Sequence, residues 1–179
     1  MRCFLALTLP DALRQQLALA LEQAGDRPHN VRLVNERLWH VTLAFLGEVA
    51  EAAIEPVLKA LTPETKRPGQ LIFTQLESFP HRWPRLLVAH AQALPSLTWQ
   101  RFVEEVREKV RPHCPNLDDK PWTGHVTLAR AKRGETLSNW SSPIGPWTWQ
   151  PAGFSLMQST LGGLGGPIYR SLHDFTFLP

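Results

Sequence analysis

The sequence predicts a fold that mixes helices and strands within one domain of 179 residues. Three observations predict it. The chain is 43% hydrophobic and 20% charged, which is ordinary for a globular domain of this length. Apolar runs of strand-like length alternate along the chain with segments of helical periodicity. The pentapeptide His-Val-Thr-Leu-Ala also occurs twice, at His40–Ala44 and His125–Ala129, so each half carries one copy and internal duplication is expected.

The first half begins with a strand and a helix whose ends are marked by structure-breaking residues. The apolar run at 4–9 ends at Pro10 and is typical of a buried strand. Leucines then recur at every fourth position from Leu13 to Leu21, which predicts a helix over 11–24 that Gly25 ends. The other elements expected in this half are strands at 31–34 and 38–46, a helix at 48–61, and strands at 71–79 and 86–91 around a turn at 80–84.

The second half begins with a helix that Ser96 is expected to cap and that runs to about Val110. Its predicted inner face consists of Leu97, Phe102, Val103, Val106 and Val110. The polar, proline-rich segment 132–146 is expected to be a connection, and the glycine-rich segment 162–166 a flexible loop that flanks a cleft. The strands expected here are 122–130, 147–157 and 168–177. The element order is therefore β-α-β-β-α-β-β followed by α-β-β-β.

Each copy of the repeat is two-sided, because alternate side chains of a strand point to opposite faces. His40 and Thr42 are expected to share one face, and His125 and Thr127 the corresponding face in the second copy. The valine and leucine of each copy point the other way and can enter a core. The repeat thus predicts two polar half-sites, each with an apolar back.

Two histidines and two hydroxyl groups in one cleft suit acid–base chemistry on a phosphodiester. Imidazole titrates near pH 6.5, so one ring can accept a proton while the other donates one. Such a pair gives a bell-shaped dependence of rate on pH. The threonine hydroxyls can donate hydrogen bonds to the nonbridging phosphate oxygens.

Other catalytic designs lack their sequence signatures. The repeats supply two imidazoles and no carboxylate at the same spacing, so neither a metal centre nor any other cofactor is expected. A Gly-x-Ser-x-Gly nucleophile motif and a Walker phosphate loop are both absent from the sequence. Cys3 and Cys114 are the only cysteines, and neither lies in a nucleophile motif.

At these residues the sequence resembles the two-histidine phosphoesterases, whose signature is a pair of His-x-Thr/Ser-x motifs. The two motifs here are His40–Leu43 and His125–Leu128. Their flanking residues, the opening strand and the chain length are similar to those of the bacterial RNA 2′,3′-cyclic phosphodiesterases, once called 2′-5′ RNA ligases. The resemblance implies a single bilobal α+β domain over 1–179, with a pseudo-twofold axis. It implies two antiparallel sheets that form a central groove, and helices on the outside.

The resemblance also implies metal-independent hydrolysis of a 2′,3′-cyclic phosphate to a 2′-phosphomonoester. It makes His40 the proton donor and His125 the proton acceptor, an assignment that two identical pentapeptides cannot supply by themselves. Thr42 and Thr127 would contact the phosphate. Arg130 either joins them or forms a structural salt bridge, since simple strand alternation places it on the apolar face unless the strand ends or bulges first.

The partner implied by the resemblance is RNA with a cyclic phosphate end, or a cyclic nucleotide. With a net charge of +3, no apolar stretch near 18 residues and no recognisable export signal, a monomeric cytoplasmic protein is expected. Cleavage or ligation of 2′-5′ bonds and non-catalytic binding of RNA ends are the alternative functions. Trp83, in the turn at 80–84, either stacks on a base or packs over the edge of the core.

Overall fold

The computed structural model describes residues 1–61, 65–162 and 166–178. It contains three α-helices, α1 (Asp11–Gln23), α2 (Glu51–Leu61) and α3 (Ser96–Val110), and two single 3-10 turns, Glu36–Leu38 and Arg111–His113. Its strands are β1 (Arg2–Thr8), β2 (Val31–Leu33), β3 (His40–Glu48), β4 (Thr65–Lys66), β5 (Gln70–Phe79), β6 (Leu86–Leu94), β7 (His125–Ala131), β8 (Ser141–Trp149), β9 (Gly153–Gly162) and β10 (Gly166–Leu178). The glycine-rich loop expected at 162–166 falls mainly outside the described residues.

The strands form one ten-stranded sheet in the order β4-β10-β9-β1-β3-β7-β6-β5-β8, with β2 paired to β7. The described strands thus do not divide clearly into the two antiparallel sheets that were expected. The strands of the two repeats pair directly, and their single bridge, Val41 with Val126, joins the sheets of the two halves into one. The pairing of β4 with β10 is parallel, and the other pairings are antiparallel.

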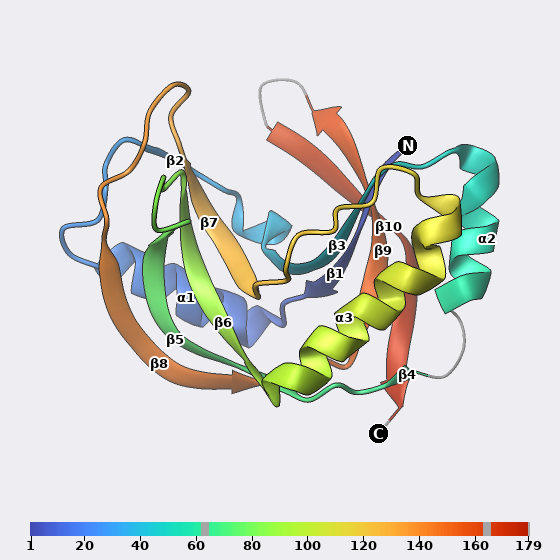
Figure 1. Ribbon diagram of the computed structural model, residues 1–179. Coiled ribbons are helices and arrows are strands. Elements are labelled where there is room, and N and C mark those ends of the chain that lie inside the picture. Colours follow the sequence, from blue (N-terminus) through green and yellow to red (C-terminus); the bar gives the residue numbers. More distant parts are fainter. Residues whose placement is uncertain (62–64, 163–165, 179) are drawn as a thin grey trace.

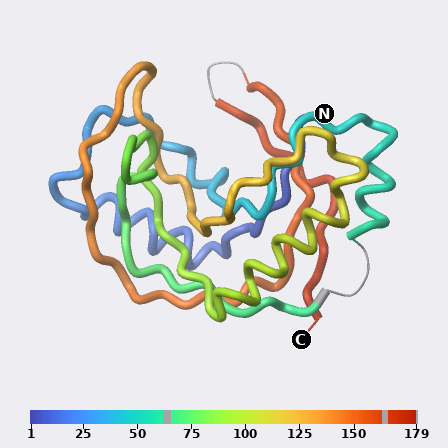
Figure 2. Tube along the Cα trace, viewed as in Figure 1, coloured from blue at the N-terminus to red at the C-terminus, as the bar shows by residue number. Residues whose placement is uncertain are grey.

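The sheet is strongly curved, and the two repeat strands lie at its centre (Figure 1). The tube view shows the same curved arrangement, with β9 and β10 in red at one side of it (Figure 2). Helix α3 packs against β3, β6 and α2, and α1 lies beside β8. Helices α2 and α3 lie on the same side of the molecule in this view, away from β8 (Figure 1).

The helices bury the faces that their periodicity predicts, with one exception. Helix α1 buries its three leucines, and α3 buries Phe102, Val103, Val106 and Val110. Leu97 is instead 67% exposed, while Trp99 in the same turn is fully buried. A tryptophan buries more apolar area than a leucine, so the first turn of α3 places Trp99 in the core.

The proline-rich segment 132–146 is a connection only in its first part, because β8 begins at Ser141. β8 contains Pro143 and Pro146 and lies at the edge of the sheet. Proline has no N–H to donate to a neighbouring strand. An edge strand tolerates it, because one side of such a strand is unpaired. The single strand expected at 147–157 is therefore divided between β8 and β9.

Candidate active site

The two repeats face one cavity at the centre of the sheet. The antiparallel pair of Val41 and Val126 is fully buried and relates β3 to β7 by a local twofold axis. Continuing this register by one residue sets His40 opposite Thr127 and Thr42 opposite His125. All four of these polar side chains line a cavity of about 760 Å³. The structure thus brings together the histidines and threonines that the repeat singles out.

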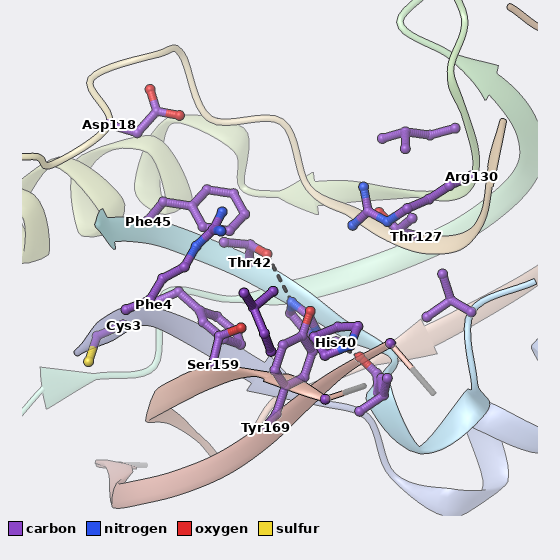
Figure 3. A pocket seen from close by; sticks show the side chains of 18 of the residues that line it. Cys3, Phe4, His40, Thr42, Phe45, Asp118, Thr127, Arg130, Ser159 and Tyr169 are labelled. Carbon is purple, nitrogen blue, oxygen red and sulfur yellow. Dashed lines mark hydrogen bonds between the residues drawn. The ribbon is translucent and has the colours of Figure 1, made fainter. Parts of the chain in front are cut away.

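Both histidines are held in the same tautomer by the same local contact. The Nδ1 atom of His40 lies 2.7 Å from the carbonyl oxygen of Leu38, and that of His125 lies 2.8 Å from the carbonyl oxygen of Thr123. A carbonyl oxygen can only accept, so Nδ1–H is the donor in each ring. This leaves Nε2 of each imidazole for proton transfer. In the first half-site, Nε2 of His40 lies 3.1 Å from the hydroxyl of Thr42 (Figure 3).

Burial and neighbouring cations lower the pKa of both imidazoles below the ordinary 6.5. For His40, burial is the main cause, the bond to Leu38 opposes it, and the charges of His125 and Arg130 lower the pKa further. For His125, burial again dominates and the bond to Thr123 opposes it, while the charges of His90 and Arg130 lower the pKa and that of Glu77 raises it. Both rings therefore favour the neutral form more than free imidazole does.

A β-bulge occurs at the same position of each repeat. Between β1 and β3 the register passes from Leu5–Ala44 to Ala6–Thr42, so Leu43 is the extra residue. Between β6 and β7 it passes from Leu87–Ala129 to Val88–Thr127, so Leu128 is the extra residue. Each bulge inverts the alternation of the side chains that follow.

The bulges bring the fifth residue after each histidine into the cavity. Phe45 follows the first bulge and Arg130 the second, and both line the cavity instead of pointing to the core. Phe45 is 49% exposed there. Simple alternation from His40 would instead place Phe45 on the apolar face of the strand. Arg130 lies across the cavity from His40 and close to Thr127 (Figure 3).

Aromatic side chains from other strands surround His40. The ring of Phe4, on β1, lies 5.0 Å from the imidazole of His40, and that of Tyr169, on β10, lies 5.4 Å from it at an angle of 83°. Arg2 and Arg32 also line the cavity. Sequence reasoning missed these four residues. Tyr169 is the only tyrosine of the chain, but nothing in its local pattern indicates which side of its strand faces the site.

The remaining aromatic candidates lie elsewhere. Trp83 is 66% exposed and does not line the central cavity. Trp147 and Trp149 are partly buried and pack against the core. Among the residues that the structure describes, no group of three or more histidine, cysteine, aspartate or glutamate side chains is placed to hold a metal ion. No helix of the described chain has the length and hydropathy needed to cross a membrane.

Known proteins are similar to this chain in sequence and in fold. Residues 7–88 match the family model described as LigT-like phosphoesterase. A protein of Thermus thermophilus named RNA 2′,3′-cyclic phosphodiesterase is 32% identical over 98% of this chain and 90% of its own length. A protein of Archaeoglobus fulgidus with the same name is 29% identical over 98% of this chain and 99% of its own length.

Two solved structures have the same fold over almost the whole chain. The crystal structure of TT0787 from Thermus thermophilus superposes with a TM-score of 0.83 and 28% identity, over 99% of this chain and 98% of its own. That of Escherichia coli LigT complexed with ATP has a TM-score of 0.79 and 22% identity over the same shares. The fold and the paired His-x-Thr motifs define a two-histidine phosphoesterase. Within that class, the chain belongs to the LigT-like phosphoesterase family, as its full-length likeness to the Thermus thermophilus relative shows.

Proposed function

We propose that this protein hydrolyses the 2′,3′-cyclic phosphate of an RNA end or a nucleotide to a 2′-phosphomonoester, without a metal ion. One observation carries the proposal: two imidazoles, each held through Nδ1 by a backbone carbonyl, line one cavity from two strands related by a local twofold axis. A displacement at phosphorus needs proton transfers at the entering and the leaving oxygen. A pair of facing proton carriers meets that need. The names of the relatives support the substrate class.

In the proposed reaction, His125 removes a proton from a water molecule through its neutral Nε2. The water oxygen bonds to phosphorus, and the bond between phosphorus and the ribose 3′ oxygen breaks. Protonated His40 gives its Nε2 proton to that leaving oxygen. The product carries a 2′-phosphate and a free 3′ hydroxyl, and the two histidines have exchanged protonation states. Each proton transfer contributes about 10²–10⁴-fold to the rate.

Neutral and cationic donors around the phosphate complete the proposed site. Thr42 and Thr127 donate hydroxyl hydrogen bonds to the nonbridging oxygens, where negative charge is concentrated. Arg130 supplies a guanidinium, which binds phosphate oxygens in a bidentate manner. Phe4, Phe45 and Tyr169 offer apolar surface on the His40 side of the cavity for a base or a ribose.

The test is to incubate the protein with 2′,3′-cyclic AMP and with an oligoribonucleotide that ends in a cyclic phosphate, both in EDTA, and to identify the phosphate isomer formed. We expect turnover and a 2′-phosphate product. Reversible loss of activity on chelation, or a 3′-phosphate product, would contradict the proposal. Tight binding of both substrates without turnover would favour a non-catalytic RNA-end module. A 2′-5′-linked oligonucleotide assayed in parallel tests for cleavage or ligation of that bond.

A further inference from the structure

The second half-site has two titratable neighbours on the adjacent strands, His90 and Glu77. In the sheet, the residue opposite His125 is His90 of β6, whereas the residue opposite His40 on β1 is Thr8. Glu77 of β5 lies next to His90: its carboxylate is 3.4 Å from Nδ1 of His90. The two half-sites thus share their backbone geometry and their Nδ1 hydrogen bonds but differ in the residue on the adjacent strand.

Glu77 is an unusual residue for its place in the sheet. It is 92% buried, its relative exposure being 8%, and a buried carboxylate is unfavourable unless a positive or hydrogen-bonding partner compensates it. The two imidazoles near it are His90 and, on its other side, His81, whose Nε2 is 3.9 Å away. His81 is 77% exposed, so water screens its charge, while His90 lies between Glu77 and the active-site histidine.

The Nδ1 atom of His90 is buried and has no hydrogen-bond partner among the described residues. The carboxylate of Glu77 is its nearest charged group, at ion-pair distance. When His90 is protonated, this contact becomes an ion pair. It then holds the ring of His90, on β6, between Glu77 on β5 and His125 on β7. The charge of His90 then lies directly beside His125.

We propose that His90, held by Glu77, is a positioning residue that keeps His125 in the neutral, proton-accepting form and so distinguishes the two half-sites. The inference rests on the proposed function for the direction of proton transfer. Neither residue lines the central cavity, so neither is expected to contact the substrate. Their effect reaches the reaction through His125.

The electrostatics of the second half-site agree with this geometry. After burial, which lowers the pKa of His125 most, and the opposing bond to Thr123, the charge of His90 is the next cause and lowers the pKa further. Arg130, on the same strand, lowers it too, and Glu77 raises it. Removing His90 alone therefore removes a cation and leaves the carboxylate of Glu77 uncompensated, and both changes raise the pKa of His125.

The test follows the imidazole C–H resonances of His125 and His40 by NMR as the pH is varied, with His90→Asn compared to the unaltered protein. The spectra of His40→Gln and His125→Gln assign the two resonances. We expect the pKa of His125 to rise in His90→Asn and that of His40 not to rise with it, because added charge on His125 lowers the pKa of His40. His81→Asn is the matched control, because it contacts the same carboxylate without lying opposite His125, and it should leave both titrations in place. An unchanged His125 titration in folded His90→Asn overturns the proposal.

Two further measurements keep the proposal testable. Adding Glu77→Gln to His90→Asn removes the uncompensated carboxylate. The pKa of His125 should then return part of the way to its value in the unaltered protein. In His90→Lys, which keeps a cation on β6 opposite His125, the pKa of His125 should stay close to its value in the unaltered protein. A rise of that pKa in folded His90→Lys overturns the proposal even if His90→Asn does not fold.

Enzyme kinetics separate this proposal from the proposed function. The NMR titrations need no substrate, so they decide the role of His90 whether or not a cyclic phosphate is hydrolysed. If it is hydrolysed, the acidic limb of the kcat/KM profile should move to higher pH in His90→Asn. At pH 5.5, the kcat/KM of His90→Asn, taken as a fraction of its own optimum, should be about threefold or more below the same fraction for the unaltered protein. The basic limb should not move. A uniform loss of rate at every pH would indicate a merely structural role.

Discussion

Raising the pH above neutrality should reduce kcat/KM steeply, because the proposed proton donor loses its proton there. Burial lowers the pKa of His40 below the ordinary 6.5, and burial does the same for His125. The active form of the free enzyme carries a proton on His40 and none on His125. Since the pKa of each ring lies below 6.5, this form is most abundant on the acidic side of that value. The optimum of kcat/KM should therefore lie below pH 6.5.

The size of the effect follows from single-proton titration. Beyond the upper pKa, the protonated fraction of His40 falls about tenfold for each pH unit. With an upper pKa at or below 6.5, the fall in kcat/KM between pH 7.0 and pH 8.5 is about 20–30-fold. A donor with a raised pKa would show a smaller fall, and one with a pKa well above about 8.5 would keep nearly full activity over that interval.

The assay is hydrolysis of 2′,3′-cyclic AMP in EDTA, at substrate concentrations well below KM and at constant ionic strength from pH 5 to pH 9. Circular dichroism at each pH checks that the protein remains folded. A kcat/KM optimum at or above pH 8, or a flat profile over the whole range, would refute the reasoning from burial to protonation state. A bell-shaped curve centred below pH 6.5 is the expected result.

Three further predictions concern the bulges and the support of the site. Arg130→Gln should lower kcat/KM by about 10–100-fold and weaken inhibition by inorganic phosphate, with only partial recovery in Arg130→Lys, and an unchanged kcat/KM would contradict its proposed contact with phosphate. Leu128→Ala should lower the free energy of unfolding by about 2–5 kcal/mol in urea denaturation, because the side chain of this bulge residue is fully buried, and a loss below about 1 kcal/mol would show that the core does not depend on it. Gly47→Ala should lower the free energy of unfolding by about 1–3 kcal/mol. Gly47 has a φ of +70°, and a Cβ there would lie 2.6 Å from the Cβ of Asn116. Gly25→Ala, where a Cβ would meet nothing within 4 Å, is the control for thermal unfolding, and equal melting temperatures for the two variants would refute the argument.

Strand alternation within the repeat was enough to predict the core of the candidate site. The valines next to the two histidines are fully buried, and the histidines and threonines line the cavity, as the two-residue period requires. This part of the site depends only on residues close together in the sequence. The face that each side chain takes could therefore be predicted without knowing how the strands pair.

The positions of Phe45 and Arg130 could not be predicted in the same way. They depend on bulges at Leu43 and Leu128, and a bulge is a property of two paired strands. The sequence of one strand does not specify the register of its partner. Internal symmetry was the signal available, because the leucine that bulges occupies the same place in both pentapeptides.

The aromatic neighbours of His40 depend on still longer-range pairing. Phe4 and Tyr169 come from opposite ends of the chain and meet at His40 because β9 lies between β1 and β10 in the sheet. The joining of two expected sheets into one has a similar origin. It rests on the single pair of Val41 and Val126, which no local sequence pattern predicts.

The most direct test of the central claim, that the two half-sites act as one acid–base pair, is the pH dependence of kcat/KM for His40→Ala and His125→Ala in EDTA. Each variant should lose about 10²–10⁴-fold at the optimum. The residual activity of His40→Ala should lack the basic limb of the profile, and that of His125→Ala the acidic limb. Full activity in either variant, or an unchanged bell-shaped profile in both, would contradict the account.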